Sequence, residues 1–242
     1  MRTPYVGITG FTAPEEVAWA LRSFPPGRRH LMVGVLVSDR TLEGLPEEQH
    51  PRRHPPVADL PTLFPEDPRA FNVVHFHTRT PEALAAQADR LIALSGPRLH
   101  GLQVNLHETP AEELRKIRAR HPALALILPL RSPAPDLASR FVEQDARLVD
   151  VALFDLSAGR GLLVDPGQAR SALEEIEARM PGVALAVAGG LGPDTIHRVH
   201  LLLERFPDLS IDAESRLRDA EDRLDPERVA EYLRGALPPG PD

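Results

Sequence analysis

The chain has 242 residues, of which 42% are hydrophobic and 26% charged, and its formal net charge is −7. This composition is that of an ordinary soluble globular protein, and the acidic balance argues against a nucleic-acid-binding protein. The absence of cysteine excludes disulfides, Cys-ligated zinc, iron–sulfur clusters and a thiol nucleophile.

Short β-rich runs alternate with helical runs along the chain. The expected strands are Tyr5–Thr9, Leu31–Val37, Asn72–His77, Leu102–His107, Leu124–Leu130, Val149–Asp155, Val183–Ala188 and Leu209–Ala213. The expected helices are Pro14–Ser23, Pro81–Leu94, Pro110–Arg120, Pro135–Asp145, Pro166–Met180, Pro193–Arg205 and Pro226–Leu233. Each helix has a proline near its start, where proline is favoured.

Strict alternation of strands and helices implies a parallel sheet. Eight such units in this length predict a single (β/α)8 TIM barrel over residues 1–236, followed by a frayed tail at 237–242. A doubly wound open sheet is the structural alternative. The second helix is mostly replaced by a long loop at 39–70, with a short helix near Val57–Phe64, and this loop either covers the barrel mouth or is an excursion without function.

Alternation along the strands predicts which side chains point into the barrel. The apolar faces should contact the outer helices, which leaves His75, His77, Asn105 and His107 inside, together with Ser210, Asp212 and Glu214. Catalytic groups of such barrels gather at the carboxyl ends of the strands. We therefore expect His77, His107, Asp155 and Glu214 at the mouth, either as a site or as a satisfied polar network.

Two glycine-rich corners follow the sixth and seventh strands. The segment AGGLGPD at 188–194 leads into an expected helix, where Gly189 and Gly190 allow close approach of a phosphate to backbone N–H groups. The segment SAGRGLLVD at 157–165 contains Gly159 and Gly161, and is either a second ligand loop or a plain turn.

The order of these motifs resembles that of phosphoribosylanthranilate isomerase, a (β/α)8 barrel of the tryptophan pathway. The segments that carry the resemblance are VGIT (6–9), SDR (38–40), NLH (105–107), ALFDLSAGRGLLVD (152–165), VAGGLGPDTI (187–196) and IDAESRLRDAEDRLDPERV (211–229). The resemblance implies an Amadori-type isomerisation of a phosphorylated sugar amine, with Asp155 as general acid and Arg40 holding the substrate carboxylate. Ser215 and Arg216 stand in the phosphate loop after the eighth strand.

Several positions depart from this family. Its general base is the cysteine of CGIT, and Val6 occupies that position here. The base would therefore have to be His77, His107 or Glu214. The glycine of the eighth-strand phosphate loop is replaced by Arg216, which either supplies charge to the phosphate or fills the pocket.

Three functions are consistent with these residues. The first is an isomerase of the phosphoribosylanthranilate type, an intramolecular oxidoreductase that needs no cofactor. The second is a different enzyme on the same scaffold, either acting on another phosphosugar or assisted by a metal that the His75-x-His77 pair would hold with His107, Asp155 and Glu214. The third is a homologue that binds a phosphorylated metabolite without turnover.

A small phosphorylated substrate is the expected partner, and the protein is expected to be a monomer or homodimer. No apolar run is long enough for a signal peptide core or a membrane span, so a cytoplasmic protein without membrane or nucleic-acid partners is expected.

Overall fold

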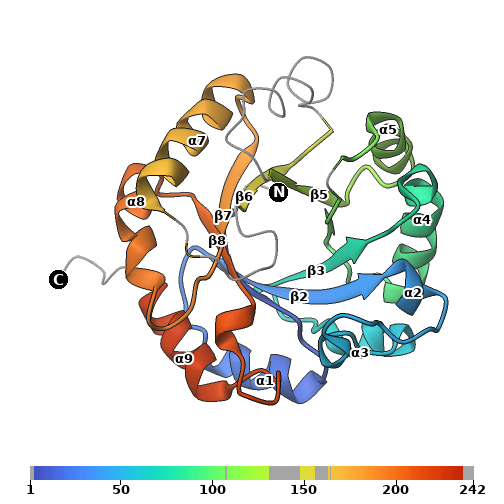
Figure 1. Cartoon of the computed structure of the whole chain (residues 1–242), viewed down its shortest axis with the longest axis horizontal. Coiled ribbons are helices and arrows are strands. Elements are labelled where there is room, and N and C mark those ends of the chain that lie inside the picture. The colour runs from blue at the N-terminus through green and yellow to red at the C-terminus, as the bar shows by residue number, and fades with distance from the viewer. Residues whose placement is uncertain (1–2, 107, 131–147, 156–162, 164, 237–242) are drawn as a thin grey trace.

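The computed structural model describes residues 3–106, 108–130, 148–155, 163 and 165–236. Eight parallel strands close into a barrel in the order β1 to β8, and β8 pairs with β1 (Figure 1). The strands are β1 Tyr5–Thr9, β2 His30–Ser38, β3 Ala70–His77, β4 Gly101–Val104, β5 Ala125–Leu130, β6 Val151–Asp155, β7 Ala184–Ala188 and β8 Ser210–Ala213. The prediction of a (β/α)8 barrel is confirmed.

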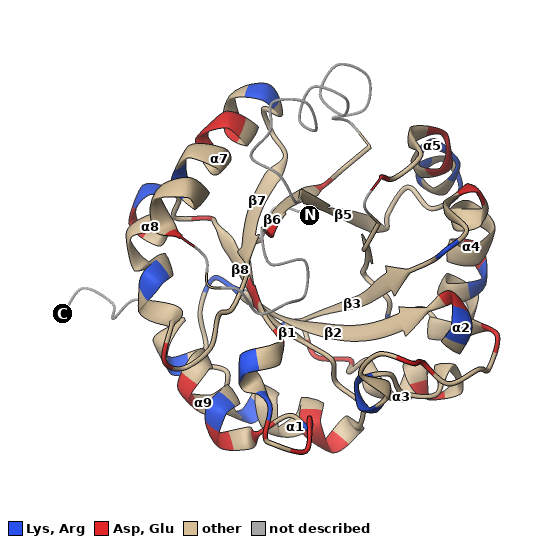
Figure 2. Ribbon diagram, in the orientation of Figure 1, with Lys and Arg blue, Asp and Glu red and all other residues tan. Residues whose placement is uncertain are grey.

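The helices form a ring outside the strands (Figure 1). They are α1 Pro14–Ser23, α2 Asp39–Leu42, α3 Leu60–Leu63, α4 Leu84–Ser95, α5 Ala111–Arg120, α7 Pro166–Arg179, α8 His200–Arg205 and α9 Pro226–Gly235. Acidic and basic side chains are interspersed over this ring (Figure 2), as in α5, whose first turn is acidic and whose last turn is basic. The helix expected at Pro135–Asp145 and the tail at 237–242 lie outside the described residues.

The longer ring helices each bury an apolar stripe. In α9, Val229, Tyr232 and Leu233 are fully buried, at the spacing of one helical face. The Asp225 side chain accepts hydrogen bonds from the N–H groups of Glu227 and Arg228, and Pro226 occupies the first turn. Local capping and the buried stripe thus specify this helix together.

The barrel interior has its own core. Tyr5, Met32, Phe71, Val73, Ala125, Ile127, Val151, Leu153 and Ala186 form a cluster separate from the larger one between strands and helices. Phe71 and Val73 share a strand face with His75, and Val151 and Leu153 share one with Asp155, because side chains alternate along a strand. On β8, Ile211 and Ala213 belong to the outer cluster, so Ser210 and Asp212 face inward. The predicted inward faces are therefore confirmed for β3, β6 and β8: apolar residues fill the barrel toward its amino end, and polar residues point inward nearer the mouth.

The segment 39–70, expected as a long loop with one short helix, contains further short helices. It contains α2, two 3₁₀ turns at Pro51–Arg53 and Val57–Asp59, and α3, and it buries Leu42, Leu60, Leu63 and Phe64. The short helix expected at Val57–Phe64 is present as a 3₁₀ turn followed by α3. The segment is therefore packed onto the barrel by its own apolar side chains.

Candidate functional site

A cavity of about 480 Å³ lies at the carboxyl ends of the strands. Its walls come from the ends of β2 and β3, from the residue after β8 and from the segment 39–70. Four of its side chains are Arg40, Arg53, His77 and Glu214. Two residues predicted for the mouth, His77 and Glu214, therefore contribute to one cavity, and we call this cavity the mouth.

A larger cavity, of about 690 Å³, lies at the opposite end of the barrel, where His30, Phe71 and His100 contribute to its wall. That end of a (β/α)8 barrel serves stability rather than chemistry in known enzymes. We therefore place the candidate site at the mouth, although its cavity is the smaller of the two.

Three carboxyl groups, those of Asp155, Asp212 and Glu214, interact electrostatically at the carboxyl ends of β6 and β8. Thr9 Oγ1 donates hydrogen bonds to both carboxyl oxygens of Asp212, at 3.0 and 3.1 Å. Burial raises the pKa of Asp212 to about 8, and the charges of Glu214 and Asp155 add to the rise, against the opposing effect of the Thr9 hydrogen bond. Asp212 therefore holds its proton at neutral pH, and it interacts electrostatically with the other two carboxyl groups.

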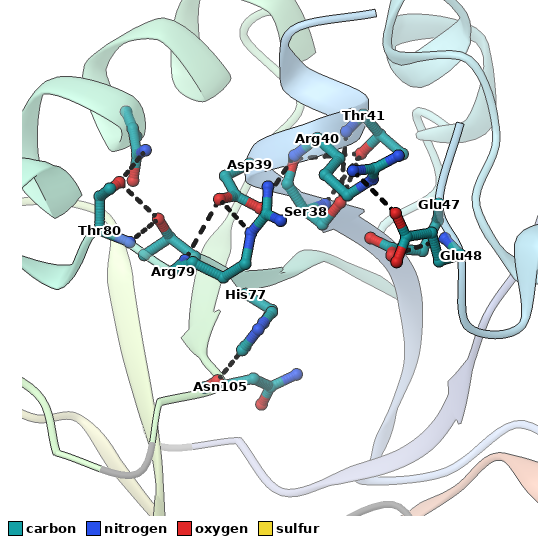
Figure 3. Close-up of polar contacts among 12 residues, drawn as sticks. Ser38, Asp39, Arg40, Thr41, Glu47, Glu48, His77, Arg79, Thr80 and Asn105 are labelled. Atoms are coloured by element: carbon teal, nitrogen blue, oxygen red, sulfur yellow. Dashed lines mark hydrogen bonds and ion pairs between the residues drawn. The ribbon is translucent and has the colours of Figure 1, made fainter. Parts of the chain in front are cut away.

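Two histidines of β3 point inward at different depths. His77 lies at the mouth, and its Nδ1 is 3.0 Å from the backbone oxygen of Asn105 (Figure 3). A carbonyl oxygen can only accept, so Nδ1 carries the proton and Nε2 of the neutral ring keeps a lone pair. His75 is 2% exposed, and burial lowers its pKa to about 3. His75 is therefore neutral at physiological pH.

Arg53 was not among the predicted site residues, yet it is the most connected residue of the mouth. It is only 7% exposed. Its Nη1 donates to Glu214 Oε1 at 2.7 Å and to Ser215 Oγ at 3.2 Å, and its Nη2 donates to Asp222 Oδ1 at 2.7 Å. The segment 39–70 is thus pinned to the loop after β8, and the predicted residues Glu214 and Ser215 are both partners of Arg53.

Arg40, expected to hold a substrate carboxylate, binds within its own segment. Its Nε donates to the Pro46 oxygen at 3.0 Å and its Nη1 pairs with Glu48 at 3.1 Å (Figure 3). Beside it, Asp39 pairs with Arg79 at 3.0 Å, which helps hold the pKa of Asp39 below its usual range despite partial burial. Arg40 thus lies at the mouth, with its charge balanced by Glu48.

The glycine loop after β7 has the backbone that only glycine adopts readily. Gly189 and Gly190 have φ values of 121° and 58°. The helix expected from Pro193 starts later, as a 3₁₀ turn at Ile196–Val199 that runs into α8. The Gly192 carbonyl accepts from the N–H groups of Thr195 and Ile196, which forms a turn there first.

Arg216 packs on this glycine loop. A Cβ on Gly192 would lie 2.5 Å from the Arg216 Cβ, so the loops after β7 and β8 are in close contact. The Arg216 Nε is buried and has no hydrogen-bond partner within the described part of the chain. The predicted phosphate residues Gly189, Gly190, Ser215 and Arg216 therefore come from two adjoining loops.

Val6 does not face the mouth. It is fully buried in the outer core with Ile8 and Phe11, so a side chain at this position contacts the helices. Gly7 faces inward instead and is paired in register with Asp212. A Cβ on Gly7 would lie 2.6 Å from Asp212 Oδ1. The Asp212 carboxyl thus occupies the space in front of the inward position of β1.

Three predicted residues, His107, Gly159 and Gly161, lie outside the described residues. β4 ends at Val104, earlier than the expected His107. Among the residues that the structure describes, no three His, Asp or Glu side chains are arranged to hold a metal ion. No helix in the described ranges is long and apolar enough to cross a bilayer.

Comparison with known proteins gives the fold class. The structure superimposes on phosphoribosyl anthranilate isomerase from Thermus thermophilus with a TM-score of 0.65 at 19% identity, covering 96% of this chain and 97% of that one. TrpF from Jonesia denitrificans gives a TM-score of 0.64 at 19% identity, with 96% of both chains covered. No family model matches the sequence, and no curated protein matches it.

A third similar structure shows how widely this fold is shared. The carboxyl transferase domain of Rhizobium etli pyruvate carboxylase gives a TM-score of 0.56 at 10% identity, covering 97% of this chain and 46% of that one. At such identities the likeness defines a TIM barrel with the overall arrangement of the isomerase, and fold alone does not fix function.

Proposed function

We propose that this chain isomerises a phosphorylated aldose amine at the mouth, in the manner of phosphoribosylanthranilate isomerase. The observation that supports this best is the match over the full length of both chains to isomerases of that class. Acid–base side chains and a glycine loop at one end of the barrel agree with it. Such groups suit a reaction that only moves protons.

The reaction needs an acid and a base. In the proposal Asp155 protonates the ring oxygen, the C1–O bond breaks, and a protonated imine forms. A base then removes the proton from C2, whose electron pair forms the C1=C2 bond while the imine nitrogen becomes neutral. The base returns its proton to C1, and the enol proton passes to the Asp155 carboxylate, which gives the ketose and restores the acid. His77 is the base we propose, because the Asn105 carbonyl leaves its Nε2 lone pair available.

The substrate's anionic groups are assigned to the two remaining sides of the mouth. Gly189, Gly190, Ser215 and Arg216 would hold the phosphate, since they lie on adjoining loops with a buried Arg216 Nε. Arg40 would hold a carboxylate after exchanging Glu48 for it.

The test is turnover of freshly made phosphoribosylanthranilate, followed by loss of its fluorescence. We expect wild type to be active and Asp155→Asn to lose about 10²–10⁴-fold in kcat, since an amide cannot donate the proton. The matched control is Asp208→Asn, at an exposed aspartate paired with Arg28 at the far end of the barrel. Full activity in Asp155→Asn would refute the assignment.

One observation favours a second function, binding without turnover. Glu214 and Ser215 are already held by Arg53, and the inward position of β1 is a glycine. A wild type that binds a phosphorylated sugar tightly while leaving phosphoribosylanthranilate unchanged would support this second function and exclude the first.

A further inference from the structure

A band of polar side chains crosses the barrel interior directly beneath the mouth. It consists of Asp212 on β8, Thr9 on β1, His75 on β3 and Gln103 on β4, and we call it the polar belt. All four are buried, with exposed fractions between 1% and 7%. The next inward residues above His75 and Asp212 are His77 and Glu214, which contribute to the mouth. The belt is therefore the layer below the mouth.

Gly34 on β2 lets the two halves of the belt approach each other. A Cβ at Gly34 would lie 2.8 Å from Thr9 Oγ1 and 3.0 Å from His75 Nε2. Both atoms therefore lie against the inward side of this glycine, where no side chain would fit. On the next strand pair His75 and Gln103 are in register. The belt therefore runs without a break from β8 to β4.

Two polar atoms of the belt have no partner. The His75 Nε2 and the Gln103 Oε1 are buried and make no hydrogen bond with any residue the structure describes. Burying a polar group unpaired costs about 1–3 kcal/mol, so such groups in native proteins normally meet a ligand or an ordered water. The remaining polar groups are already paired, Thr9 with Asp212 and the Gln103 amide nitrogen with Asn105.

The belt carries little charge at neutral pH. Burial lowers the pKa of His75 to about 3, and burial with neighbouring charges raises that of Asp212 to about 8. Leu153 and Ala186, one step nearer the amino end on β6 and β7, belong to the apolar inner cluster below the belt. A neutral imidazole, a carboxyl and an amide oxygen together match hydroxyl groups, each of which donates and accepts one hydrogen bond.

We propose that the polar belt is a subsite for the hydroxyl groups of a phosphorylated sugar or polyol. The uncharged carbon chain of this ligand enters from the mouth, and its phosphate is held above the belt. This inference rests on the proposed function for the phosphate end of the ligand. It adds that selectivity for hydroxylated carbon chains comes from His75 and Gln103, two residues without a role in the proton transfers above.

Calorimetric binding of two probes tests the subsite. Ribitol 5-phosphate and pentyl phosphate share the phosphate and the chain length and differ in hydroxyl groups. We expect wild type to bind ribitol 5-phosphate at least about tenfold more tightly, the equivalent of one or two net hydrogen bonds. Equal affinities, or binding of neither probe, would overturn the inference.

Variants assign the preference to the belt. His75→Phe and Gln103→Leu should each reduce the preference by about fivefold to tenfold while leaving the Kd of pentyl phosphate unchanged. The matched controls are His121→Phe and Gln87→Leu, which lie on the outer helices or beside them. A preference that survives both belt variants refutes the subsite. Circular dichroism checks that the variants are folded. If His75→Phe is unfolded, the preference for ribitol 5-phosphate is instead compared in Gln103→Leu and Thr9→Val.

The two proposals fail separately. A protein that does not turn over phosphoribosylanthranilate but prefers ribitol 5-phosphate, with the preference lost in Gln103→Leu, refutes the isomerase and retains the subsite. A protein that turns the substrate over without this preference retains the isomerase and refutes the subsite.

Discussion

Asp212 carries a proton where an aspartate normally carries a charge. The protonated form is favoured by burial and by the charges of Glu214 and Asp155, while Thr9 hydrogen bonds oppose the shift, and two buried tyrosines, Tyr5 and Tyr232, also lie within its field. The folded chain therefore holds this proton up to about pH 8, whereas an unfolded chain releases it near pH 4. The stability contributed by this proton is complete below about pH 4 and is lost as pH rises toward 8.

Asp212→Asn should remove this dependence, because an amide does not titrate. Between pH 5 and pH 8, the free energy of unfolding of wild type should fall relative to that of the variant by up to a few kcal/mol. Urea unfolding at several pH values measures the difference. Asp208→Asn, at the exposed far end, should follow wild type, and parallel curves for wild type and Asp212→Asn would contradict the protonated state.

The position of segment 39–70 on the barrel depends on the ion pairs of Arg53. The Arg53 guanidinium joins this segment to Glu214 and Asp222. The backbone of Asp222 has a φ of 64°. Positive φ at a non-glycine residue is strained and is kept only where surrounding contacts fix it. Arg53 therefore also holds the conformation of the loop after β8.

Arg53→Leu should lower the free energy of unfolding by about 1–3 kcal/mol, below the cost for a fully buried pair because both carboxylates are partly exposed. Proteolysis of the segment around 43–56 should become faster. The neighbouring Arg52, which is exposed and donates to the Glu221 backbone, gives the control Arg52→Leu, with a change within about 0.5 kcal/mol. Equal proteolysis of the two variants would mean that the apolar side chains alone hold the segment.

Element positions were predictable where the signal is local. Proline at the first helical turn and alternation on the strands locate β1 and α1 to the residue, and α9 to within two residues of its end. The start of α8 was wrong because Gly192 and Pro193 form a turn that delays the helix until after Ile196. Inward faces were predictable for the same reason, since alternation is a property of a single strand.

The mouth was predictable only in part. His77, Asp155 and Glu214 stand at strand ends, which the pattern reveals. The role of Arg53 depends on partners 161–169 residues away along the chain. The local sequence EEQHPRRHPP does not indicate which residues these partners are. The outward direction of Val6 could have been read from the alternation of β1, where Tyr5, Gly7 and Thr9 share the inner face.

At the scale of the whole molecule, stability depends on closing the barrel between β8 and β1. Three register pairs join these strands, and α1 and α9 lie side by side outside this junction (Figure 1). Leu233 of α9 is fully buried there. Because the first and last elements of the chain meet here, loss of packing at this point removes the contact that completes the fold.

Leu233→Ala should lower the free energy of unfolding by about 2–5 kcal/mol through lost burial and a residual cavity. Denaturant unfolding measures it. Leu201 of α8 is 69% exposed, so Leu201→Ala provides a same-chemistry control with little change expected. Similar losses in the two variants would show that the junction contributes no more than the surface.

Because β1 pairs with β8, with Gly7 opposite Asp212, side chains from the two ends of the chain meet at the site. Thr9 and Arg53 come from the first half of the chain, and their partners Asp212 and Glu214 come from the last quarter. Neither half alone contains both partners of the Thr9–Asp212 hydrogen bond or of the Arg53–Glu214 ion pair. Two separately expressed fragments cut between β4 and β5 would therefore be individually inert toward ligands, and ligand binding would report their reassociation.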